Sequence, residues 1–257
     1  MKALKSGKLL CKREHAFDLS KKGYVNFLNE TKKTQYNKEL FSSRKSLFAE
    51  GFYRPVADEI LGIVKEYRRV KEIEILRLLD AGCGEGYYSD FLSKEEGLTV
   101  FALDLSKEAI ALATDYPSPV SWAIGDLARL PYRDRSMDII LDVLTPANYK
   151  EFKRVLQNQG LLIKVIPGDE YLQEIRKAAA DHLIHKEYSN RETVDYALSH
   201  LKKPERKKVL YQLPVDREQI GHFMRMTPML SEVEESVLNR EGISSVTISM
   251  EILWGRL

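Results

Sequence analysis

Residues 78–88 (Leu-Leu-Asp-Ala-Gly-Cys-Gly-Glu-Gly-Tyr-Tyr) constrain the fold more than any other part of the chain. An apolar run precedes them and a segment able to form a helix follows, so we expect a strand, a tight turn and a helix start. Gly82, Gly84 and Gly86 let the backbone take positive φ and approach a ligand closely. Asp80 precedes the first glycine, unlike the glycine pattern of dinucleotide enzymes, and suits a ligand with an ammonium group. The pattern predicts a loop for S-adenosylmethionine (SAM), against the alternative of an ordinary strand-to-helix turn.

From about residue 77 onward, strand and helix patterns alternate, which is typical of a parallel doubly wound sheet. The seven strands that we predict cover residues 76–80, 99–104, 120–125, 137–143, 160–166, 209–213 and 246–254. The helices that we predict include a long stretch with breaks over residues 170–201 and two that begin at Asp216 and Ser231. Seven strands whose last two form a hairpin are the architecture of Rossmann-like SAM-dependent methyltransferases, an α/β class.

The first part of the chain has a different character. Residues 7–24 mix Lys, Gly and turn residues and predict a small hairpin module, and residues 29–41 are polar and predict a linker. Residues 42–67 predict broken helical structure. We therefore expect a basic N-terminal module over residues 1–35 and a SAM-dependent methyltransferase domain over residues 36–257.

Composition narrows the class of protein. The 257 residues are 44% hydrophobic and 30% charged, as expected for a globular chain with a sizeable core. No apolar run approaches the roughly 20 residues that span a bilayer, so we expect no membrane partner. A Lys-rich start without a signal-peptide core predicts the cytoplasm. The net charge is only +2, but basic clusters near the start and over residues 202–208 can contact phosphates, although a solvated surface is the alternative.

Three aspartates follow the first three predicted strands of the sheet. Asp80, Asp104 and Asp126 fall at carboxyl ends, where ligands bind in such sheets. Asp104 is placed to accept from both ribose hydroxyls because a carboxylate has two acceptor oxygens, and Asp126 from the adenine amino group. Leu105 and Leu127 adjoin these acids and complete the predicted cofactor site. Each aspartate alone can instead cap the next helix.

The end of the fourth predicted strand supplies the acceptor side of the site. In this fold it faces the methyl group, which makes Asp142, Thr145 and Asn148 candidates. Asp142 is the candidate catalytic base, with a purely structural acid as the equal alternative. His182 and His185 are weaker candidates for the same role.

Short segments spread over nearly the whole chain match one known family. They comprise residues 17–18, 22–26, 43–44, 48, 51–55, 80–88, 103–107, 130–132, 136–138, 167–168 and 226–228. Gly23-Tyr24-Val25-Asn26 and Met226-Thr227-Pro228 are the specific part, because they are not general methyltransferase motifs. On these residues the chain resembles the RlmA-type 23S rRNA (guanine-N1)-methyltransferases.

This resemblance implies an activity and several contacts. It implies methyl transfer from SAM to guanine N1 in a domain II hairpin of 23S rRNA. It also implies that Tyr53, Cys83, Gly84 and Glu85 contact the cofactor. A family histidine that contacts the cofactor is replaced here by Tyr171. The sequence is also compatible with a homodimer.

The N-terminus departs from the family pattern. Family members open with a zinc ribbon, and Cys11 and His15 match only its second half. A structural zinc needs four ligands, so we expect weak zinc binding or none, in a chain that is truncated or a ribbon that has degenerated. The same two residues can also be an unremarkable surface pair.

The predicted chemistry requires access to an edge of the base. Guanine N1 lies on the Watson–Crick edge, so the base must be unpaired or turned out before transfer. Phe52, Tyr53, Tyr87 and Tyr88 are candidates to stack on it, with core packing as the alternative. Two rival functions are methylation of a small molecule and a catalytically silent SAM- or RNA-binding relative.

Overall fold

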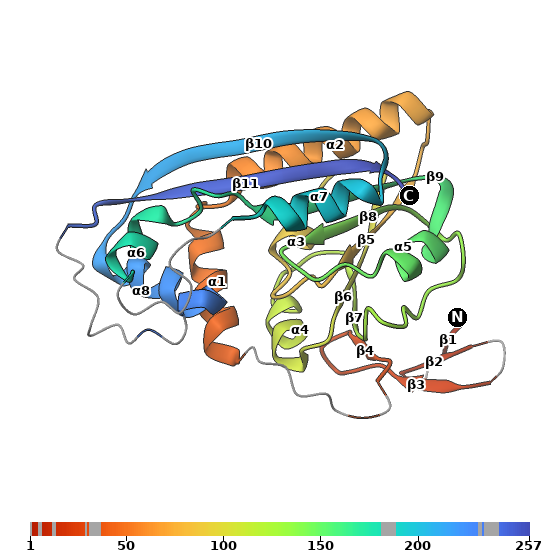
Figure 1. Ribbon diagram of the computed structural model, residues 1–257. Coiled ribbons are helices and arrows are strands. Elements are labelled where there is room, and N and C mark those ends of the chain that lie inside the picture. The colour runs from red at the N-terminus through yellow and green to blue at the C-terminus, as the bar shows by residue number, and fades with distance from the viewer. Residues whose placement is uncertain are drawn as a thin grey trace.

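The computed structural model describes residues 2–4, 7–11, 14–28, 30, 37–180, 189–230, 233 and 242–257. An eight-stranded sheet runs through its centre in the order β10-β11-β9-β8-β5-β6-β7-β4 (Figure 1). Its strands are β4 (Val25–Asn26), β5 (Leu76–Ala81), β6 (Leu98–Asp104), β7 (Ser121–Ile124), β8 (Met137–Val143), β9 (Leu156–Pro167), β10 (Lys202–Pro214) and β11 (Ser245–Arg256).

The seven predicted strands are all present, and the predicted Rossmann-like fold is confirmed. Strands β5 to β9 are parallel to one another, whereas β11 is antiparallel to both β9 and β10. β10 is 13 residues long, and its first half is charged and exposed, so apolar alternation did not mark it. β4 adds an eighth, two-residue strand by pairing parallel with β7.

The order of the strands in the sheet determines where a ligand-binding site is expected. β5 lies between β6 and β8, so the chain leaves it toward one side of the sheet and later returns on the other. Ligands bind at such a switch point, outside the carboxyl ends of the strands. The glycine loop follows β5 at this point, next to the ends of β6 and β8.

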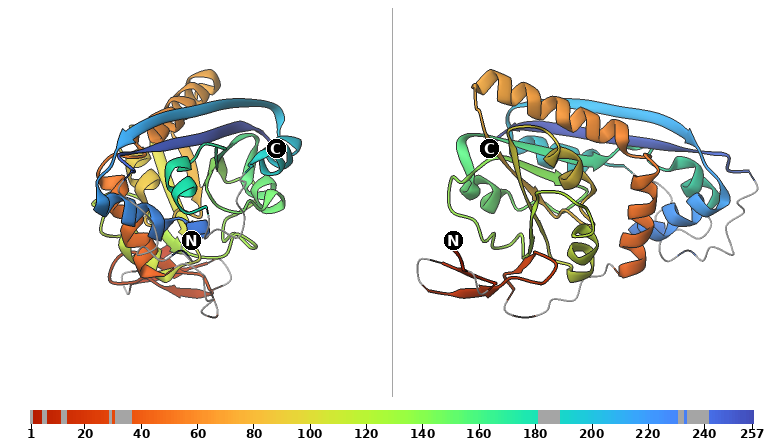
Figure 2. Two further views of the ribbon diagram at one scale, coloured as in Figure 1. Left: turned by 60° about the vertical axis from the view of Figure 1, so that its left-hand side comes forward. Right: turned by 180° about the vertical axis from the view of Figure 1, so that it is seen from behind.

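Helices cover both faces of the sheet. They are α1 (Lys38–Ala49), α2 (Arg54–Lys71), α3 (Tyr87–Ser93), α4 (Lys107–Ala113), α5 (Tyr149–Val155), α6 (Gln173–Ala178), α7 (Arg191–Ser199) and α8 (Arg217–Met226). Apolar side chains of α2, α3 and α4 pack in one buried cluster, and those of α5 and α7 pack in another on the opposite face. Figure 2 shows the helices around the sheet from two further sides. Both faces of the central strands are therefore buried, which explains their continuous apolar runs.

The predicted linker over residues 29–41 is wrong at its end. α1 begins at Lys38, and the Asn37 side chain caps it by accepting a hydrogen bond of 2.8 Å from the Leu40 N–H. Leu40 and Phe41 are buried. Two apolar residues in a polar stretch are too few to show the spacing of an amphipathic helix, so the sequence did not predict this helix start. The predicted helical stretch over 170–201 contains α6 and α7. The helix predicted from Ser231, and both His182 and His185, lie outside the described residues.

The N-terminal module is a small antiparallel sheet at one end of the molecule (Figure 1). It contains β1 (Lys2–Leu4), β2 (Lys8–Leu10) and β3 (Ala16–Asp18). Beyond β3, Lys22 donates to the Ala111 carbonyl at 3.1 Å and pairs with Asp115, which fastens the segment leading into β4 to the end of α4. Among the described helices, none is both long and apolar enough to cross a bilayer.

Replacing Gly86 tests the packing of the loop. Its φ is +91°, and an added Cβ would lie 2.5 Å from the Trp122 ring and 2.8 Å from Ala113 Cβ. Gly86→Ala should therefore lower the free energy of unfolding by about 2–4 kcal/mol, combining backbone strain with overpacking. Gly62→Ala is the matched control, because that helical glycine has no atom within 4 Å of an added Cβ, and it should raise stability by about 0.5–1 kcal/mol. Urea unfolding measures both, and a stable Gly86→Ala protein would contradict the packing argument.

Candidate functional site

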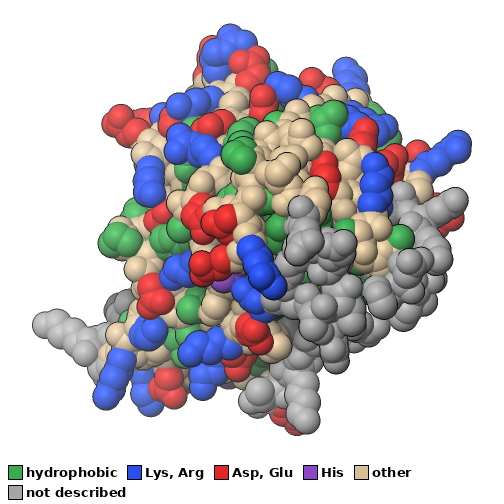
Figure 3. Space-filling view, turned by 90° about the vertical axis from the view of Figure 1, so that its left-hand side faces the viewer, with side chains coloured by type: hydrophobic (Ala, Val, Ile, Leu, Met, Phe, Trp, Pro, Cys, Tyr) green, Lys and Arg blue, Asp and Glu red, His purple; other side chains and the backbone are tan. Residues whose placement is uncertain are grey.

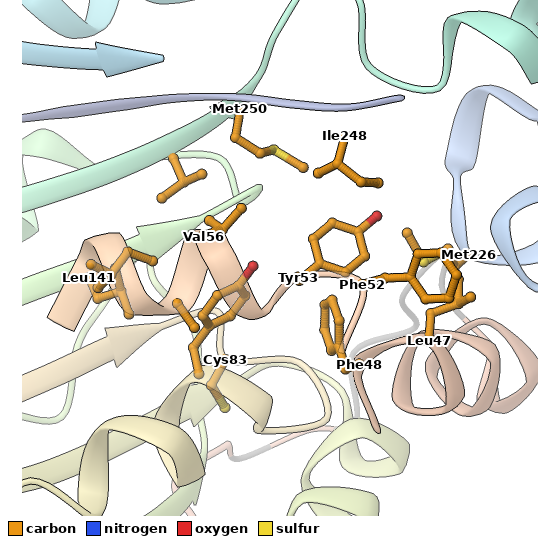
Figure 4. Packing of buried hydrophobic residues seen from close by; sticks show 14 of the residues in the cluster. Leu47, Phe48, Phe52, Tyr53, Val56, Cys83, Leu141, Met226, Ile248 and Met250 are labelled. Carbon is orange, nitrogen blue, oxygen red and sulfur yellow. The ribbon is translucent and has the colours of Figure 1, made fainter. Parts of the chain in front are cut away.

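The glycine loop between β5 and α3 is folded against the end of β6. Gly82, Gly84 and Gly86 have φ values of +84°, +57° and +91°, so each predicted glycine takes the left-handed conformation. The Gly82 and Cys83 N–H groups both donate to the Leu103 carbonyl, at 2.8 and 3.1 Å. Cys83 is buried in the core cluster shown in Figure 4. The loop is therefore held from below by the neighbouring strand.

Asp104 ends β6 and holds the tip of the loop. One carboxylate oxygen accepts from the Gly84 N–H at 2.9 Å, and the other accepts from the Ser106 N–H at 2.8 Å. Each oxygen keeps a further acceptor position, so the side chain can still accept from ribose hydroxyls. Burial raises the pKa of Asp104, against the hydrogen bonds and the nearby Arg44 guanidinium. Leu105, the next residue, is half-buried.

Two further acids are buried, one just before the loop and one within it. Asp80, near the end of β5, is 1% exposed and accepts a hydrogen bond of 2.6 Å from Ser89 Oγ. Burial raises the pKa of Asp80 to about 7, and burial also raises that of Glu85 to about 7 against the opposing effect of Arg44. A cation bound here would favour the ionised forms of both groups. The site therefore fits a cofactor that carries sulfonium and ammonium charges.

Asp126 and Leu127 follow β7 at the same edge of the sheet. The Asp126 carboxylate accepts from the Ala128 N–H at 2.8 Å, and Gly125 N–H donates to the Asp104 carbonyl at 2.9 Å. The Leu127 carbonyl accepts from the Asn148 amide at 3.1 Å, which joins this loop to the start of α5. The ends of β6, β7 and β8 are thus connected around one site.

Tyr53 and Tyr171 meet through their hydroxyl groups at 2.6 Å. Tyr53 is fully buried against Phe48, as Figure 4 shows, and only Tyr171 lines the cavity described below. Phe52 and Tyr88 are also buried in the core. The stacking role predicted for Phe52, Tyr53 and Tyr88 is therefore wrong. These rings pack in the core, which was the alternative given for them.

A cavity of about 610 Å³ lies beside the loop, at the carboxyl ends of β8 and β9. Thr145 forms the wall between them: its hydroxyl donates to the Gly82 carbonyl at 3.3 Å, and a Cβ on Gly82 would lie 2.5 Å from the Thr145 side chain. Residues 144–147, 164–167 and 226–228 line the cavity, so the Met-Thr-Pro segment faces it. The predicted acceptor side and the family-specific segment meet here.

The cavity is aromatic and basic. Its lining includes the rings of Tyr149, Tyr171 and Tyr196 and the cations Arg44, Lys164 and Arg176, and the lining residues that the structure describes include no carboxylate. Arg44 also lies over the glycine loop, with Nη1 3.6 Å from the Cβ position of Gly84. Sequence reasoning gave no role to Arg44 or Lys164. The sequence offered two indications of them. Arg44 belongs to Ser43-Arg44, one of the segments that carry the family resemblance, and Lys164 is a single lysine within an apolar strand.

Asp142 does not face the cavity. Its side chain is fully buried on β8, and its carboxylate accepts a hydrogen bond of 3.0 Å from Lys164 Nζ, which does line the cavity. Burial raises the pKa of Asp142 to about 6, against the effect of the Lys164 ammonium. Lys164 therefore lies between the predicted base and any ligand in the cavity. Thr145 lines the cavity, whereas Asn148 caps α5 beside it.

The basic cluster over residues 202–208 is largely neutralised. On β10, Arg206 pairs with Glu251 at 2.9 Å, Lys207 with Glu59 at 2.6 Å, and Lys208 with Glu170 at 2.7 Å. Basic and acidic side chains are interspersed on the face of the molecule that Figure 3 shows. The cluster therefore offers fewer free cations to phosphates than its sequence indicates.

Cys11 and His15 are joined through their backbones, since the Cys11 N–H donates to the His15 carbonyl at 3.0 Å. Within the described ranges, no group of three or more His, Cys, Asp or Glu side chains is placed to hold a metal ion. The described residues thus add no third or fourth ligand to this half-site.

Comparisons with known proteins agree with this geometry. Residues 79–164 match the family model described as a methyltransferase domain. YxjB of Bacillus subtilis, whose name proposes a 23S rRNA (guanine-N1)-methyltransferase, is 35% identical over 97% of this chain and 92% of its own length. The Streptomyces fradiae 23S rRNA (guanine(748)-N1)-methyltransferase is 26% identical over 94% of this chain and 88% of its own.

A solved structure supports the fold. The PH0226 protein of Pyrococcus horikoshii superposes with a TM-score of 0.50 at 16% identity, over 80% of this chain and 91% of that protein. The sequence similarity to YxjB extends over nearly the full length of both proteins, beyond the shared methyltransferase core. The chain belongs to the family of SAM-dependent 23S rRNA (guanine-N1)-methyltransferases.

Proposed function

We propose that this chain transfers a methyl group from SAM to N1 of a guanine in a domain II hairpin of 23S rRNA. The observation that carries the proposal is the aromatic, basic cavity that shares the Thr145 wall with the glycine loop. A wall one side chain thick suits a reaction in which donor and acceptor must lie in line. The cytoplasm, where ribosomal RNA is found, is the expected location.

On the cofactor side, we propose contacts from the residues that the sequence singled out. Asp104 and Leu105 would hold the ribose, Asp126 and Leu127 the adenine, and the loop over residues 82–86 the methionine part. Asp80 comes just before this loop, and Arg44 Nη1 lies 3.6 Å from the Cβ position of Gly84, where a guanidinium can pair with the SAM carboxylate. Tyr53 would act through its hydrogen bond to Tyr171. SAM supplies a methyl group activated by a positively charged sulfur.

On the acceptor side, the cavity is large enough for a base turned out of its stack, since small-molecule pockets are commonly about 300–1,000 Å³. Tyrosine rings can stack on such a base, and cations can bind the phosphates that flank it. We propose that the N-terminal module over residues 1–35 holds a further part of the hairpin, and that residues 36–257 form the catalytic domain.

A methylation assay tests the proposed function. Labelled methyl groups from SAM should enter a synthetic domain II hairpin, and primer extension should stop at one guanine because N1 methylation blocks Watson–Crick pairing. A hairpin with that guanine replaced by adenine is the control. Methylation of metabolites without RNA, or RNA binding without methyl transfer, would favour the rival functions and overturn the proposal.

The pH dependence of SAM affinity tests the role of Asp80. The pKa of Asp80 is about 7 without ligand, and a bound cation favours the ionised carboxylate, so SAM affinity should rise between about pH 6 and about pH 7.5. Asp80→Asn should weaken binding about tenfold at pH 7.5 and make this rise smaller, because its amide cannot ionise and only Glu85 then still titrates in this range. Calorimetry measures both quantities.

The control for this experiment is Asp115→Asn, which changes an exposed acid paired with Lys22 and should leave SAM affinity unchanged.

The raised pKa values of Asp80 and Glu85 also make the stability of the protein depend on pH. A carboxyl whose pKa is raised by folding stabilises the protein below the unfolded value of about 4, and this contribution is lost as pH rises through about 7. SAM affinity that is equally pH-dependent in Asp80→Asn would remove Asp80 from the site.

A further inference from the structure

We propose that the Lys164 ammonium donates a hydrogen bond to O6 of the target guanine and stabilises the base after it has lost its N1 proton, with Asp142 as the positioning residue. This inference rests on the proposed function and names the group that makes guanine N1 reactive. It replaces the expectation that a carboxylate takes the proton directly.

The geometry of Lys164 leaves one donor for a ligand. Its side chain is 7% exposed, and Nζ donates to the Asp142 carboxylate at 3.0 Å and to the Thr145 carbonyl at 2.8 Å. An ammonium has three N–H donors, so these two bonds fix its position and leave the third. Because Lys164 lines the cavity, that third donor is available to a ligand there.

The chemistry of the reaction calls for such a donor. Guanine N1 carries a proton at neutral pH, and once it leaves, negative charge moves onto O6, which is already a hydrogen-bond acceptor. A cation held in position at the site of developing charge stabilises that charge without the reorganisation that solvent requires. The described lining has three cations and no carboxylate, so it favours the anionic base over a neutral base with a protein acceptor for its proton.

The step balances without any further reactant. The N1 proton leaves to solvent water, and the N1 lone pair forms the new bond to the methyl carbon. The electrons of the broken carbon–sulfur bond stay on sulfur, which becomes a neutral thioether. Lys164 keeps its own proton throughout and acts only by charge and hydrogen bonding.

The groups around Lys164 have other partners or stay protonated, which leaves Lys164 as the donor to O6. Burial raises the pKa of Tyr149 to about 12, so its hydroxyl stays protonated at neutral pH. Arg176 donates to the Tyr171 carbonyl at 2.8 Å, and Tyr171 is bonded to Tyr53. Arg44 lies over the loop, and Tyr196 of α7 lines the outer part of the same cavity with an exposed ring. The nearest acid on β11, Glu251, is paired with Arg206.

Backbone strain at the end of β8 supports a functional role. Leu144 has φ of +55°, a conformation that costs a residue with a side chain about 1–3 kcal/mol. The next residue, Thr145, offers its carbonyl to Lys164 and its hydroxyl to the Gly82 carbonyl. One strained turn thus holds the ammonium and the cofactor loop at a fixed separation.

Single-turnover methylation rates of the hairpin, measured from about pH 6 to about pH 10, test the inference. The wild-type rate should rise with pH and level off at the pKa of the bound guanine N1. Lys164→Met should slow the reaction about 10²–10³-fold near pH 7 and move the levelling point to higher pH, so that its deficit shrinks at alkaline pH. Lys164→Arg, which keeps a cationic donor, should recover part of the rate.

Further variants separate catalysis from folding. Asp142→Asn should lower kcat with little change in KM, because it loosens the ammonium without removing it. The double variant Asp142→Asn with Lys164→Met leaves no unpaired buried charge, so it should fold, bind SAM as wild type does, and share the pH profile of Lys164→Met. Lys153→Met removes an exposed lysine on α5 and should match wild type.

The outcomes distinguish this inference from the proposed function. If the wild-type protein methylates no rRNA hairpin, the proposed function fails. If it does, but Lys164→Met or the folded double variant slows the reaction equally at every pH or not at all, then Lys164 does not stabilise the deprotonated base, and the pair with Asp142 is structural.

Discussion

The hydrogen bonds that fasten the glycine loop to the end of β6 are the constraint on which the rest of the site depends. Gly82 and Cys83 donate to Leu103, and Gly84 donates to the Asp104 carboxylate. The loop then meets the neighbouring strands on either side, with Gly86 packed on Trp122 of β7 and Gly82 against Thr145 just beyond β8. Three strands therefore fix one loop, and a bulkier residue at either outer glycine would collide with the side chain of Thr145 or of Trp122.

The site separates charge of opposite sign across the Thr145 wall. The buried acids Asp80 and Glu85 lie at the loop, where a cationic cofactor would bind, and Lys164 and Arg176 line the cavity, where a nucleic acid would enter. Burial raises the pKa of both acids to about 7, and a bound cation would favour their ionised forms. The arrangement therefore disfavours exchange of the two ligands between the two sides.

Local pattern predicted the strands, the glycine loop and the positions of Asp104 and Asp126, because each depends on neighbours in sequence. The parts that sequence reasoning missed depend on distant partners. Lys164 and Asp142 pair across 22 positions, and β4 pairs with a strand about a hundred residues later. The buried ring of Phe52 illustrates the same limit, since an aromatic residue at a helix end fits a core and a binding surface equally well.

The pairing of β4 with β7 has a mechanical consequence. β7 ends next to Asp126, at the adenine end of the proposed cofactor site, while β4 continues from the segment that carries the N-terminal sheet. A force on that sheet is therefore transmitted through two backbone-paired residues to the strand that positions Asp126. RNA that displaced the module on binding would change cofactor affinity, and cofactor would change RNA affinity by the same factor. In that case the short edge strand would couple the binding of RNA to the binding of the cofactor, by a route that needs no contact between the two ligands.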